Sequence, residues 1–429
     1  MNNRIAKNLA EISPGTLFVG VDVGKKGHQV SIMTEKANIE ARLKIDNSRG
    51  GFEYLLNQAL YHKEKLGCRA VLFASEPAGH YWRPLAYFLE TEGQTFRLVN
   101  SFSVKRFREG MDLARTKNDR RDADTIADML RSGRFVQTIL PYGVHAELRR
   151  SYRHYCRLRA EMSKKRNLLI AAVDSLFPEF RKAFKDILGK TSTAVLRACP
   201  SPTVIKRFSV EEWESLVRSH YQGKVFRGRK KVHLVYQLAQ ESVGIPVEGQ
   251  SLLREVSLLL ESINCVDSQI QILERDLLFY LYQVKGHELL LSIRGIGIIS
   301  AAAILAEIGD MQKFGRIKGP VKLAGINPSE KQSGDFRGKS VMTKKGRALL
   351  RSALYLAAVG LISNNKAFRD YYYSLRKREV RPLSKMKAIG AVMNKLIRVV
   401  YALLKKGEPF NEEMVYQAKE PKEVVLQVA

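Results

Sequence analysis

The stretch LFVGVDVGKKGHQVSIMT, residues 17–34, decides the fold of the first part of the chain. Its first seven residues are mostly apolar and β-branched, and they end at a turn of glycine and lysine. HQVSIMT then alternates between apolar and polar positions, and IEARLKI (residues 39–45) does so again after a polar break. These patterns predict three strands joined by tight turns, which form an antiparallel meander.

Outward from this meander, the chain alternates helices and strands. An amphipathic pattern predicts a helix over residues 51–66, and RAVLFASE (residues 69–76) predicts a buried strand. A helix near residues 83–92 and the short strand FRLVN (residues 96–100) follow. Meander, helix, strand, helix, strand is the order of an RNase H-like α/β domain. We expect this domain to end after the helix that holds Asp122, near residue 140.

The middle of the chain predicts two long helices around an insert. Residues 144–180 are helical and very basic, and residues 248–284 carry apolar residues at heptad spacing. Together they predict an antiparallel coiled-coil arm. Residues 181–245 show no clear pattern beyond the basic cluster at 224–231. Because so many like charges repel one another, the first helix is expected to face nucleic acid, with Arg149, Arg150 and Arg153 as contacts; the alternative is a solvated helix face.

Composition points to a polyanionic partner. Lys and Arg number 72 against 43 Asp and Glu, which gives a formal net charge of +29. The charge is spread over the chain rather than gathered on one amphipathic helix, which argues against a membrane surface. The four cysteines lie far apart in the sequence, so we expect neither a zinc site nor disulfides. We expect their side chains to be buried and apolar, in a protein of a reducing compartment. The N-terminus has no apolar signal segment, so a cytoplasmic protein is expected.

Two acids stand at costly positions in the predicted sheet. Asp22 lies within an apolar β-branched strand, and Glu76 ends the strand VLFASE. A charge in such a place needs compensation. One isolated acid of this kind is commonly an edge residue, whereas two acids on neighbouring strands of one small sheet favour a binding site.

The segment KNDRRDADTIADML (residues 117–130) supplies two further acids. At about 100° per residue, Asp119 and Asp122 fall on the apolar side of the helix, and Asp124 and Asp128 fall on the solvent side. Inward carboxylates repel one another unless a cation joins them. Oxygen ligands without nearby His or Cys favour Mg²⁺ or Mn²⁺. The alternative is that Asp119 caps the helix and Asp122 pairs with a neighbouring arginine.

The last segment, about residues 286–406, is expected to be helical with short loops. IRGIGIISAAAILAEIG (residues 293–309) resembles a helix-hairpin-helix, in which Gly295 and Gly297 would free backbone N–H groups for a phosphate; the alternative is a tight turn in a bundle packed by small residues. A loop farther on holds Ser333. Its basic neighbours are Arg337, Lys339, Lys344, Lys345, Arg347 and Arg351. Without a histidine base, chemistry alone favours a turn residue over a nucleophile for Ser333.

These motifs, in this order, resemble transposases of the IS110 family, the DEDD transposases of bacterial insertion sequences. The N-terminal motifs are GVDVGKKGHQVSI, ASEPAGHYW and TKNDRRDADTIA, and the C-terminal motifs are IRGIGIISAAAILAEIGD, LAGINPSEKQSG and GKSVMTKKGRALLRSALYLAA. They cover a little under half of the chain. Residues 181–245 have no counterpart that we can place in the family pattern.

The resemblance implies a RuvC-like first domain with Asp22, Glu76, Asp119 and Asp122 as metal ligands. It also implies a serine nucleophile in the second domain, which favours Ser333, with Ser329 and Ser340 as the other choices. The two catalytic parts are implied to come from different subunits of a dimer or tetramer. A structured guide RNA that pairs with target and donor DNA is implied as a further partner.

The sequence thus predicts a Mg²⁺-dependent DNA transposase or recombinase in the bacterial cytoplasm, associated with the nucleoid. We expect a RuvC-like metal-binding domain (1–140), a basic coiled-coil region with an insert (141–285), a helical domain with the serine (286–406) and a flexible tail (407–429). Two other functions stay open. One is a junction endonuclease that uses the acids and water, and the other is a non-catalytic nucleic-acid-binding relative.

Overall fold

The structure, a computed structural model, describes residues 3–77, 79–101, 103–104, 119–137, 140–245, 250–329, 332–333, 336–337 and 341–415. The side chains at residues 3–4, 119–120, 137, 250, 329, 332–333, 336–337 and 414 lie outside the described part. Contacts within the chain divide it into two units, Met1–Leu140 and Pro141–Ala429. Each unit is described by itself below.

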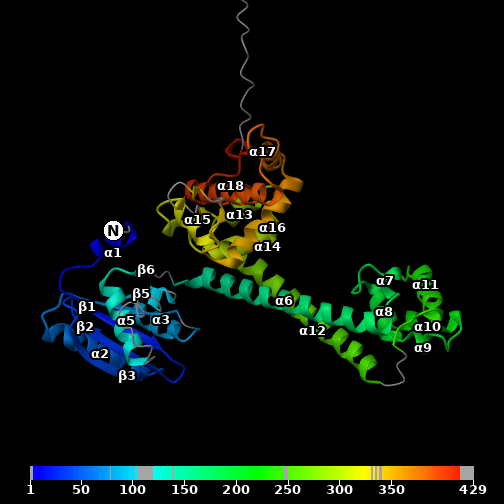
Figure 1. The fold of residues 1–429 in the computed structure, drawn as a ribbon, viewed down its shortest axis with the longest axis horizontal. Coiled ribbons are helices and arrows are strands. Elements are labelled where there is room, and N and C mark those ends of the chain that lie inside the picture. Colours follow the sequence, from blue (N-terminus) through cyan, green and yellow to red (C-terminus); the bar gives the residue numbers. More distant parts are fainter. Residues whose placement is uncertain are drawn as a thin grey trace, which may run out of the picture. The chain divides into compact units, whose positions relative to one another are not determined.

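The first unit is built on a six-stranded mixed sheet of order β3-β2-β1-β4-β5-β6 (Figure 1). β1 to β3 form the predicted antiparallel meander, β4 and β5 run parallel to β1, and β6 is antiparallel to β5. The strands are β1 (Thr16–Val23), β2 (Gly27–Met33), β3 (Ile39–Asp46), β4 (Ala70–Ser75), β5 (Thr95–Val99) and β6 (Phe135–Gln137). The helices are α1 (Asn3–Ala10), α2 (Arg49–Lys65), α3 (Trp82–Thr91) and α5 (Asp119–Arg131). The predicted element order is confirmed, while α1 and β6 are too short for periodicity to reveal.

Both faces of the central strand β1 are buried, which explains its nearly continuous apolar run. Leu17, Val19 and Val21 belong to the core that α2 and α3 share with the sheet. Phe18 belongs to the opposite core, with α5. α5 lies directly on β1 at Gly20, where a Cβ atom would come within 2.3 Å of a backbone oxygen of α5.

The second unit begins with two helices of 34 residues each, α6 (Gly143–Leu176) and α12 (Gln250–Gln283), which run side by side (Figure 1). They pack antiparallel, because the start of α6 shares a core with the end of α12, and the end of α6 with the start of α12. Leu158 packs with Val266, Ile270 and Leu273 between these ends. The heptad spacing of α12 predicts this seam.

Five short helices fill the connection between α6 and α12, and we call them the cap. They are α7 (Phe180–Ala183), α8 (Lys190–Ala198), α9 (Pro202–Ile205), α10 (Val210–Ser219) and α11 (Arg229–Gln240). Trp213 is fully buried in the cap and donates its indole N–H to the carbonyl of Val232 at 3.2 Å. Glu214 accepts hydrogen bonds from His233, Arg218 and Arg229, and these partners lower its pKa to about 2. The insert is therefore a folded part with its own core.

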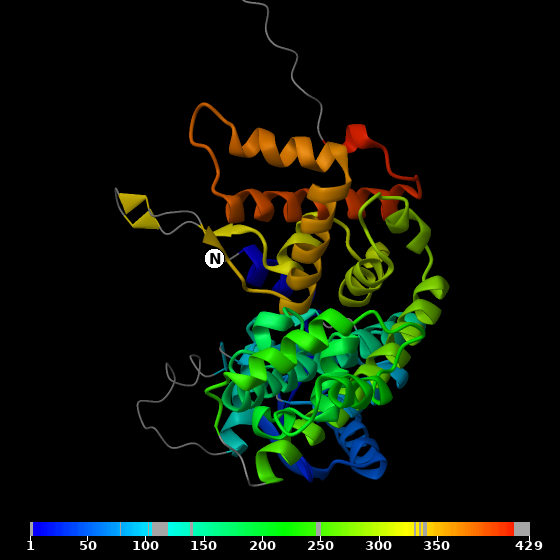
Figure 2. The ribbon, with the colours of Figure 1, turned by 90° about the vertical axis from the view of Figure 1, so that its right-hand side faces the viewer.

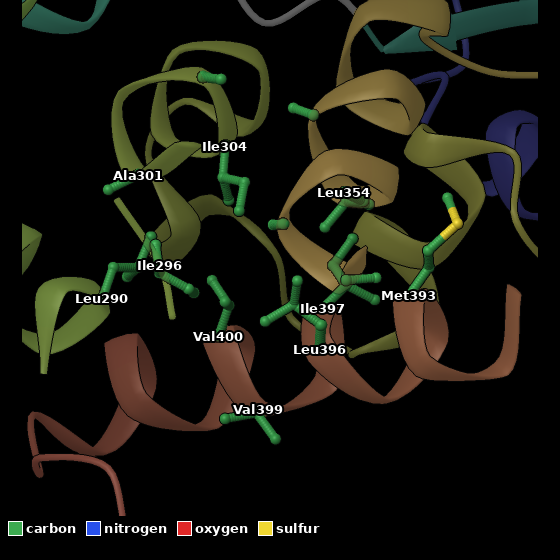
Figure 3. Close-up of a cluster of buried hydrophobic side chains, with 14 of the residues drawn as sticks. Leu290, Ile296, Ala301, Ile304, Leu354, Met393, Leu396, Ile397, Val399 and Val400 are labelled. Carbon is green, nitrogen blue, oxygen red and sulfur yellow. The ribbon is translucent and has the colours of Figure 1, made fainter. Parts of the chain in front are cut away.

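A helical bundle completes the second unit. Its helices are α13 (His287–Leu291), α14 (Ile298–Ile308), η1 (Met311–Lys313), α15 (Lys318–Ala324), α16 (Ala348–Asn364), α17 (Lys366–Arg376), α18 (Lys385–Lys406) and η2 (Glu412–Met414). Figure 3 shows Ile304 of α14, Leu354 of α16 and Ile397 of α18 among the buried side chains of one shared core. Four two-residue strands interrupt the predicted helical pattern: β7 (Pro328–Ser329), β8 (Gln332–Ser333), β9 (Phe336–Arg337) and β10 (Val341–Met342).

Two expectations need correction. The start of the predicted flexible tail packs against the bundle, because Phe410 stacks on Phe368 at 6.2 Å between ring centroids and Val415 is buried; residues 416–429 lie outside the described part. The four cysteines were expected to be buried, but Cys265 is exposed, Cys68 and Cys156 are half-buried, and Cys199 is buried. No described helix is both long and apolar enough to span a bilayer.

Candidate active site and nucleic-acid interface

The register of the sheet brings two of the predicted acids next to each other. Val21 of β1 and Ser75 of β4 are the last parallel partners, so Asp22 and Glu76 occupy the next position on each strand. Neighbouring strands lie about 4.8 Å apart, and aligned residues point to the same face. Asp22 shares the face of Gly20, which is the face that α5 covers. Both acids are half-buried.

Two contacts of α5 give its direction over the sheet. Arg131, the last residue of α5, donates a hydrogen bond to the carbonyl of Glu35 at 3.4 Å. Glu35 follows the end of β2 that pairs with the start of β1. Asp124 accepts hydrogen bonds from Nη2 and Nε of Arg42, at 2.9 and 3.2 Å, and Arg42 is aligned through β2 with Gly20. α5 therefore runs antiparallel to β1, and its first turn lies toward the Asp22 end of β1.

All four predicted metal ligands thus belong to the same end of the sheet. Asp119 begins α5 and Asp122 follows one turn later, half-buried. The Asp119 side chain lies outside the described part. Among the residues that the structure does describe, no three His, Cys, Asp or Glu side chains lie together as a metal site. Asp22, Glu76 and Asp122 by themselves therefore do not form such a group.

The helical periodicity of α5 predicts its buried apolar side correctly and predicts the exposure of one acid wrongly. Ile126, Met129 and Leu130 are fully buried, as predicted. Asp128, expected on the solvent side, is only 8% exposed and accepts hydrogen bonds from Arg131. Arg131 also reaches the segment after β2, so this side of α5 is covered by a contact that the helical periodicity does not include.

Ser333 lies in a β-hairpin of the second unit, which we call the serine hairpin and which comprises β7 to β10. Ser329 pairs with Val341 in the inner ladder, and Ser333 pairs with Phe336 in the outer one. In Figure 2 the outer pair, β8 and β9, stands away from the helices, whereas the inner pair, β7 and β10, lies beside them. The side chains of Ser329, Ser333 and Arg337 lie outside the described part, as do Lys339 and Ser340 altogether. The backbone thus places Ser333 in the outer of the two ladders.

The base of the serine hairpin is fixed by a crossing of two glycines. A Cβ atom at Gly346 would lie 2.5 Å from the backbone nitrogen of Gly325, and Gly325 itself has a φ of +65°. Thr343 donates to the carbonyl of Gly325 at 3.2 Å, and the Arg347 N–H donates to the carbonyl of Leu323 at 2.7 Å. The two ends of the hairpin are therefore held together by main-chain contacts.

The basic residues predicted around Ser333 divide into two groups. Arg351 donates to the carbonyls of Ala324 and Lys344, at 3.1 and 3.3 Å. Arg347 donates to the carbonyl of Glu307, and burial lowers its pKa. These two arginines brace the base of the hairpin. Lys344 and Lys345 are exposed.

A buried acid organises the arginines of α6. Glu307 on α14 is fully buried, and Arg153 donates to both of its carboxylate oxygens, at 2.7 and 3.2 Å. Arg149 approaches the same carboxylate at 3.8 Å. The hydrogen bonds to Glu307 raise the pKa of Arg153. Arg149 and Arg153, which were expected to face nucleic acid, are thus engaged with a buried acid, and the Arg153 side chain stays 35% exposed; Arg150 is exposed beside Glu147.

The two glycines of the helix-hairpin-helix motif have different surroundings. Gly295 has a φ of +102°, and a Cβ atom there would lie 3.3 Å from the carbonyl oxygen of Gly360 on α16. Gly297 precedes α14 and has open space where a Cβ would be. Close packing explains Gly295, as the bundle alternative predicts, and Gly297 keeps an accessible helix N-terminus.

Comparisons with known proteins identify the family. A family model described as "Transposase", that of the DEDD transposases of the IS110 type, matches residues 19–178, and a second, "Transposase IS116/IS110/IS902 family", matches residues 287–373. Together they match more than half of the chain. The chain belongs to the IS110 family of transposases. It is therefore a DNA transposase or recombinase by family, and the insert lies between the two matched regions.

Relatives of this IS110-family transposase extend over nearly its whole length. The IS110 insertion-element protein of Streptomyces coelicolor is 23% identical over 93% of this chain and 96% of the relative. The transposase for IS1111A of Coxiella burnetii is 24% identical over 92% of this chain and 91% of the relative. The pilin gene-inverting protein of Moraxella bovis is 32% identical over 29% of this chain and 39% of the relative.

Sequence reasoning missed Glu307, although a signal was present. The acid interrupts the apolar run AAAILAEIG, where a charge is costly unless it is paired. The same argument selects Asp22. Its partner Arg153 is 154 positions away, so the pair itself is invisible to local patterns.

Proposed function

We propose that this chain cleaves and rejoins DNA at the ends of an insertion sequence, with Ser333 as nucleophile and Asp22, Glu76, Asp119 and Asp122 as metal ligands. The observation that supports it most is the register of β1 and β4, which aligns Asp22 with Glu76 at the end of the sheet where α5 begins. In this proposal residues 1–140 are a RuvC-like nuclease domain, 141–285 the arm with its cap, and 286–406 the domain of the serine.

The chemistry of the four acids matches a hard divalent cation. Four carboxylates without His or Cys are the donor set that Mg²⁺ or Mn²⁺ prefers. Asp22 and Glu76 would hold the ion from the sheet, and Asp119 and Asp122 from the first turn of α5. A bound ion would stabilise the negative charge that develops on the phosphodiester oxygens.

Ser333 would act by phosphoryl transfer. Its Oγ forms a bond to phosphorus and loses its proton, while the bond from phosphorus to one deoxyribose oxygen breaks and that oxygen takes up a proton. The protein–DNA phosphodiester replaces the DNA phosphodiester one for one, so a second deoxyribose hydroxyl can reverse the step and rejoin the strands. The exposed Lys344 and Lys345 would stabilise the negative charge that develops at phosphorus. Arg347 and Arg351 are less available for this role, because their side chains are bound to backbone carbonyls at the base of the hairpin.

The proposed partners are donor and target DNA duplexes, a structured guide RNA, and further copies of the chain in a dimer or tetramer, in the bacterial cytoplasm near the nucleoid. The net charge of +29 supports polyanionic partners. Pairing by RNA would account for target choice in a protein that carries few base-reading motifs.

The test uses purified protein, element-junction DNA, the RNA from its flanks and Mg²⁺, with the products separated on a denaturing protein gel. We expect a DNA-shifted protein band that Ser333→Ala abolishes and that the matched variants Ser329→Ala and Ser340→Ala keep. Cleaved DNA with no attached protein would instead identify a nuclease that uses water. Full function after Asp22→Asn would identify a non-catalytic binding protein.

A further inference from the structure

The loop between α17 and α18 is a concentrated, exposed basic segment outside the regions that the family models match, as is the basic cluster 224–231 of the cap. We call residues 376–387 the basic loop. It contains one acid, Glu379, against six cations, and all of these side chains are exposed. The cations are Arg376, Lys377, Arg378, Arg381, Lys385 and Lys387.

The basic loop is anchored at both ends. The Leu383 N–H donates to the carbonyl of Leu375 at 3.0 Å, and Leu383 packs against the bundle core. The guanidinium of Arg376 and the ammonium of Lys377 each lie 5.9 Å from the ring centre of a tyrosine on α17, Tyr372 and Tyr373. The cations therefore lie on a short loop whose two ends are held by α17 and α18.

Ion pairs do not account for these cations. Within the described residues, no ion pair joins any of the six to a carboxylate, and Glu379 takes part in none. Lys385 and Lys387 stand in the first turn of α18, where the helix dipole disfavours positive charge. A cluster of like charges at an unfavourable position indicates an external anion.

The start of α18 lies beside the serine hairpin. A Cβ atom at Gly390 would lie 3.3 Å from Cε of Met342 on β10. In Figure 2 the loop that joins α17 to α18 and the serine hairpin lie on the same side of the bundle. With about 3.4 Å per extended residue and about 1.5 Å per helical residue, the loop lies within roughly 35 Å of Ser333. That is about ten base pairs of duplex at ~3.4 Å each.

We propose that the basic loop binds the phosphate backbone of the DNA duplex that flanks the phosphodiester presented to Ser333. The inference deepens the proposed function and rests on it for the identity of the duplex. Backbone contacts by lysine and arginine release condensed counterions, so they contribute affinity without sequence preference and depend steeply on salt. The loop would thus hold the flank while the hairpin addresses one phosphate.

The experiment compares two triple variants with equal loss of charge. The loop triple is Arg378→Gln, Lys385→Gln and Lys387→Gln, and the control triple is Lys224→Gln, Arg227→Gln and Lys230→Gln, on exposed residues of the cap. Both are made in the full chain with Ser333→Ala, and the Kd for an element-end duplex is measured in EDTA at several salt concentrations. Circular dichroism checks that each variant is folded.

We expect the loop triple to weaken binding at least about 10-fold near 0.1 M salt and to reduce the slope of log K against log salt by up to ~2.7, about 0.9 per lost contact. The control triple should change Kd less than about 2-fold. A duplex cut back to a few base pairs of flank should abolish the difference between wild type and loop triple. Equal effects of both triples would mean that binding follows net charge alone and would overturn the proposal, as would an unchanged slope.

The design separates this proposal from the function on which it rests. Binding in EDTA needs neither a bound metal ion nor the serine hydroxyl, so a missing covalent product leaves the binding result valid. A parallel titration with an RNA duplex tests the alternative ligand. If the loop triple weakens RNA binding and leaves DNA binding unchanged, the assignment to flanking DNA is wrong.

Discussion

The first half of α6 and the basic loop carry similar densities of positive charge in the sequence, yet their side chains have opposite surroundings. Arg149 and Arg153 of α6 converge on the buried Glu307. Arg378 and Lys385 of the basic loop are exposed. The difference shows that a dense run of cations in the sequence does not by itself predict a nucleic-acid-binding surface, because acids from distant parts of the chain can pair with those cations. One glutamate on α14 converts part of a predicted DNA-facing helix into an internal clamp.

Removing the arginine of this clamp is the variant with the largest expected effect. Arg153→Met leaves the Glu307 carboxylate buried without its bidentate partner, which should lower the free energy of unfolding of the second unit by about 3–5 kcal/mol. The double variant Arg153→Met with Glu307→Leu should cost less than Arg153→Met alone, because no buried carboxylate remains. Urea unfolding followed by circular dichroism measures both. If the double variant instead costs as much as or more than Arg153→Met alone, Arg153 and Glu307 are not coupled, and the contrast between α6 and the basic loop fails.

The buried His28, which has no acid partner among the described residues, should make the stability of the first unit depend on pH. The ring of His28 is buried against Phe52, and burial lowers its pKa. Its Nδ1 accepts the Gly24 N–H at 3.2 Å, and its Nε2 has no hydrogen-bond partner among the described residues. The unfolded chain protonates this histidine near its ordinary pKa of about 6.5, while the folded chain resists protonation to lower pH.

The sign of the effect follows from proton linkage. The stability contributed by neutral His28 is fully present above about pH 6.5 and is lost as pH falls through the lower folded pKa, because the unfolded state then binds more protons. The Tm of the first unit should therefore fall from pH 7.5 to pH 5. His28→Gln should lower the Tm at neutral pH and flatten its decline. An equally steep decline in the variant would assign the acid sensitivity to other groups.

The smallest effect is expected for an arginine of α6 that faces solvent. Arg150 is 77% exposed at its side chain and pairs with Glu147 at 3.3 Å. Exposed pairs of this kind contribute little, so Arg150→Ala should change the free energy of unfolding by no more than about 0.5 kcal/mol. The contrast with Arg153, three residues away on the same helix, sharpens the comparison. A cost near that of Arg153→Met would contradict it.

Local patterns predicted those features that depend on neighbours in the sequence. The alternation of LFVGVDV and HQVSIMT predicted the meander, and the heptads of α12 predicted the seam that Val256, Ile263 and Ile270 form. The position of Asp22 within an apolar strand selected one of the two aligned acids. Each of these inferences needs only the period of one element and its burial.

Features that depend on distant partners escaped prediction. Asp128 is covered because Arg131 also reaches across to Glu35, and the insert folds around Trp213, whose neighbours are spread over several short helices. The ladders of the serine hairpin are two residues long, which is too short for any alternation to show. In each case the missing information is a pairing between residues far apart in the chain.

The arm separates two cores, that of the bundle and that of the cap. The bundle core takes Leu148 and Leu281, the cap core takes Val173 and Val256, and the middle contacts around Leu158 form a cluster of their own. Because the seam repeats every seven residues, a heptad deleted from both helices would shorten the arm by about 10 Å and leave either end intact. We therefore expect that the arm can be shortened in steps of one heptad while the contacts at its two ends are kept.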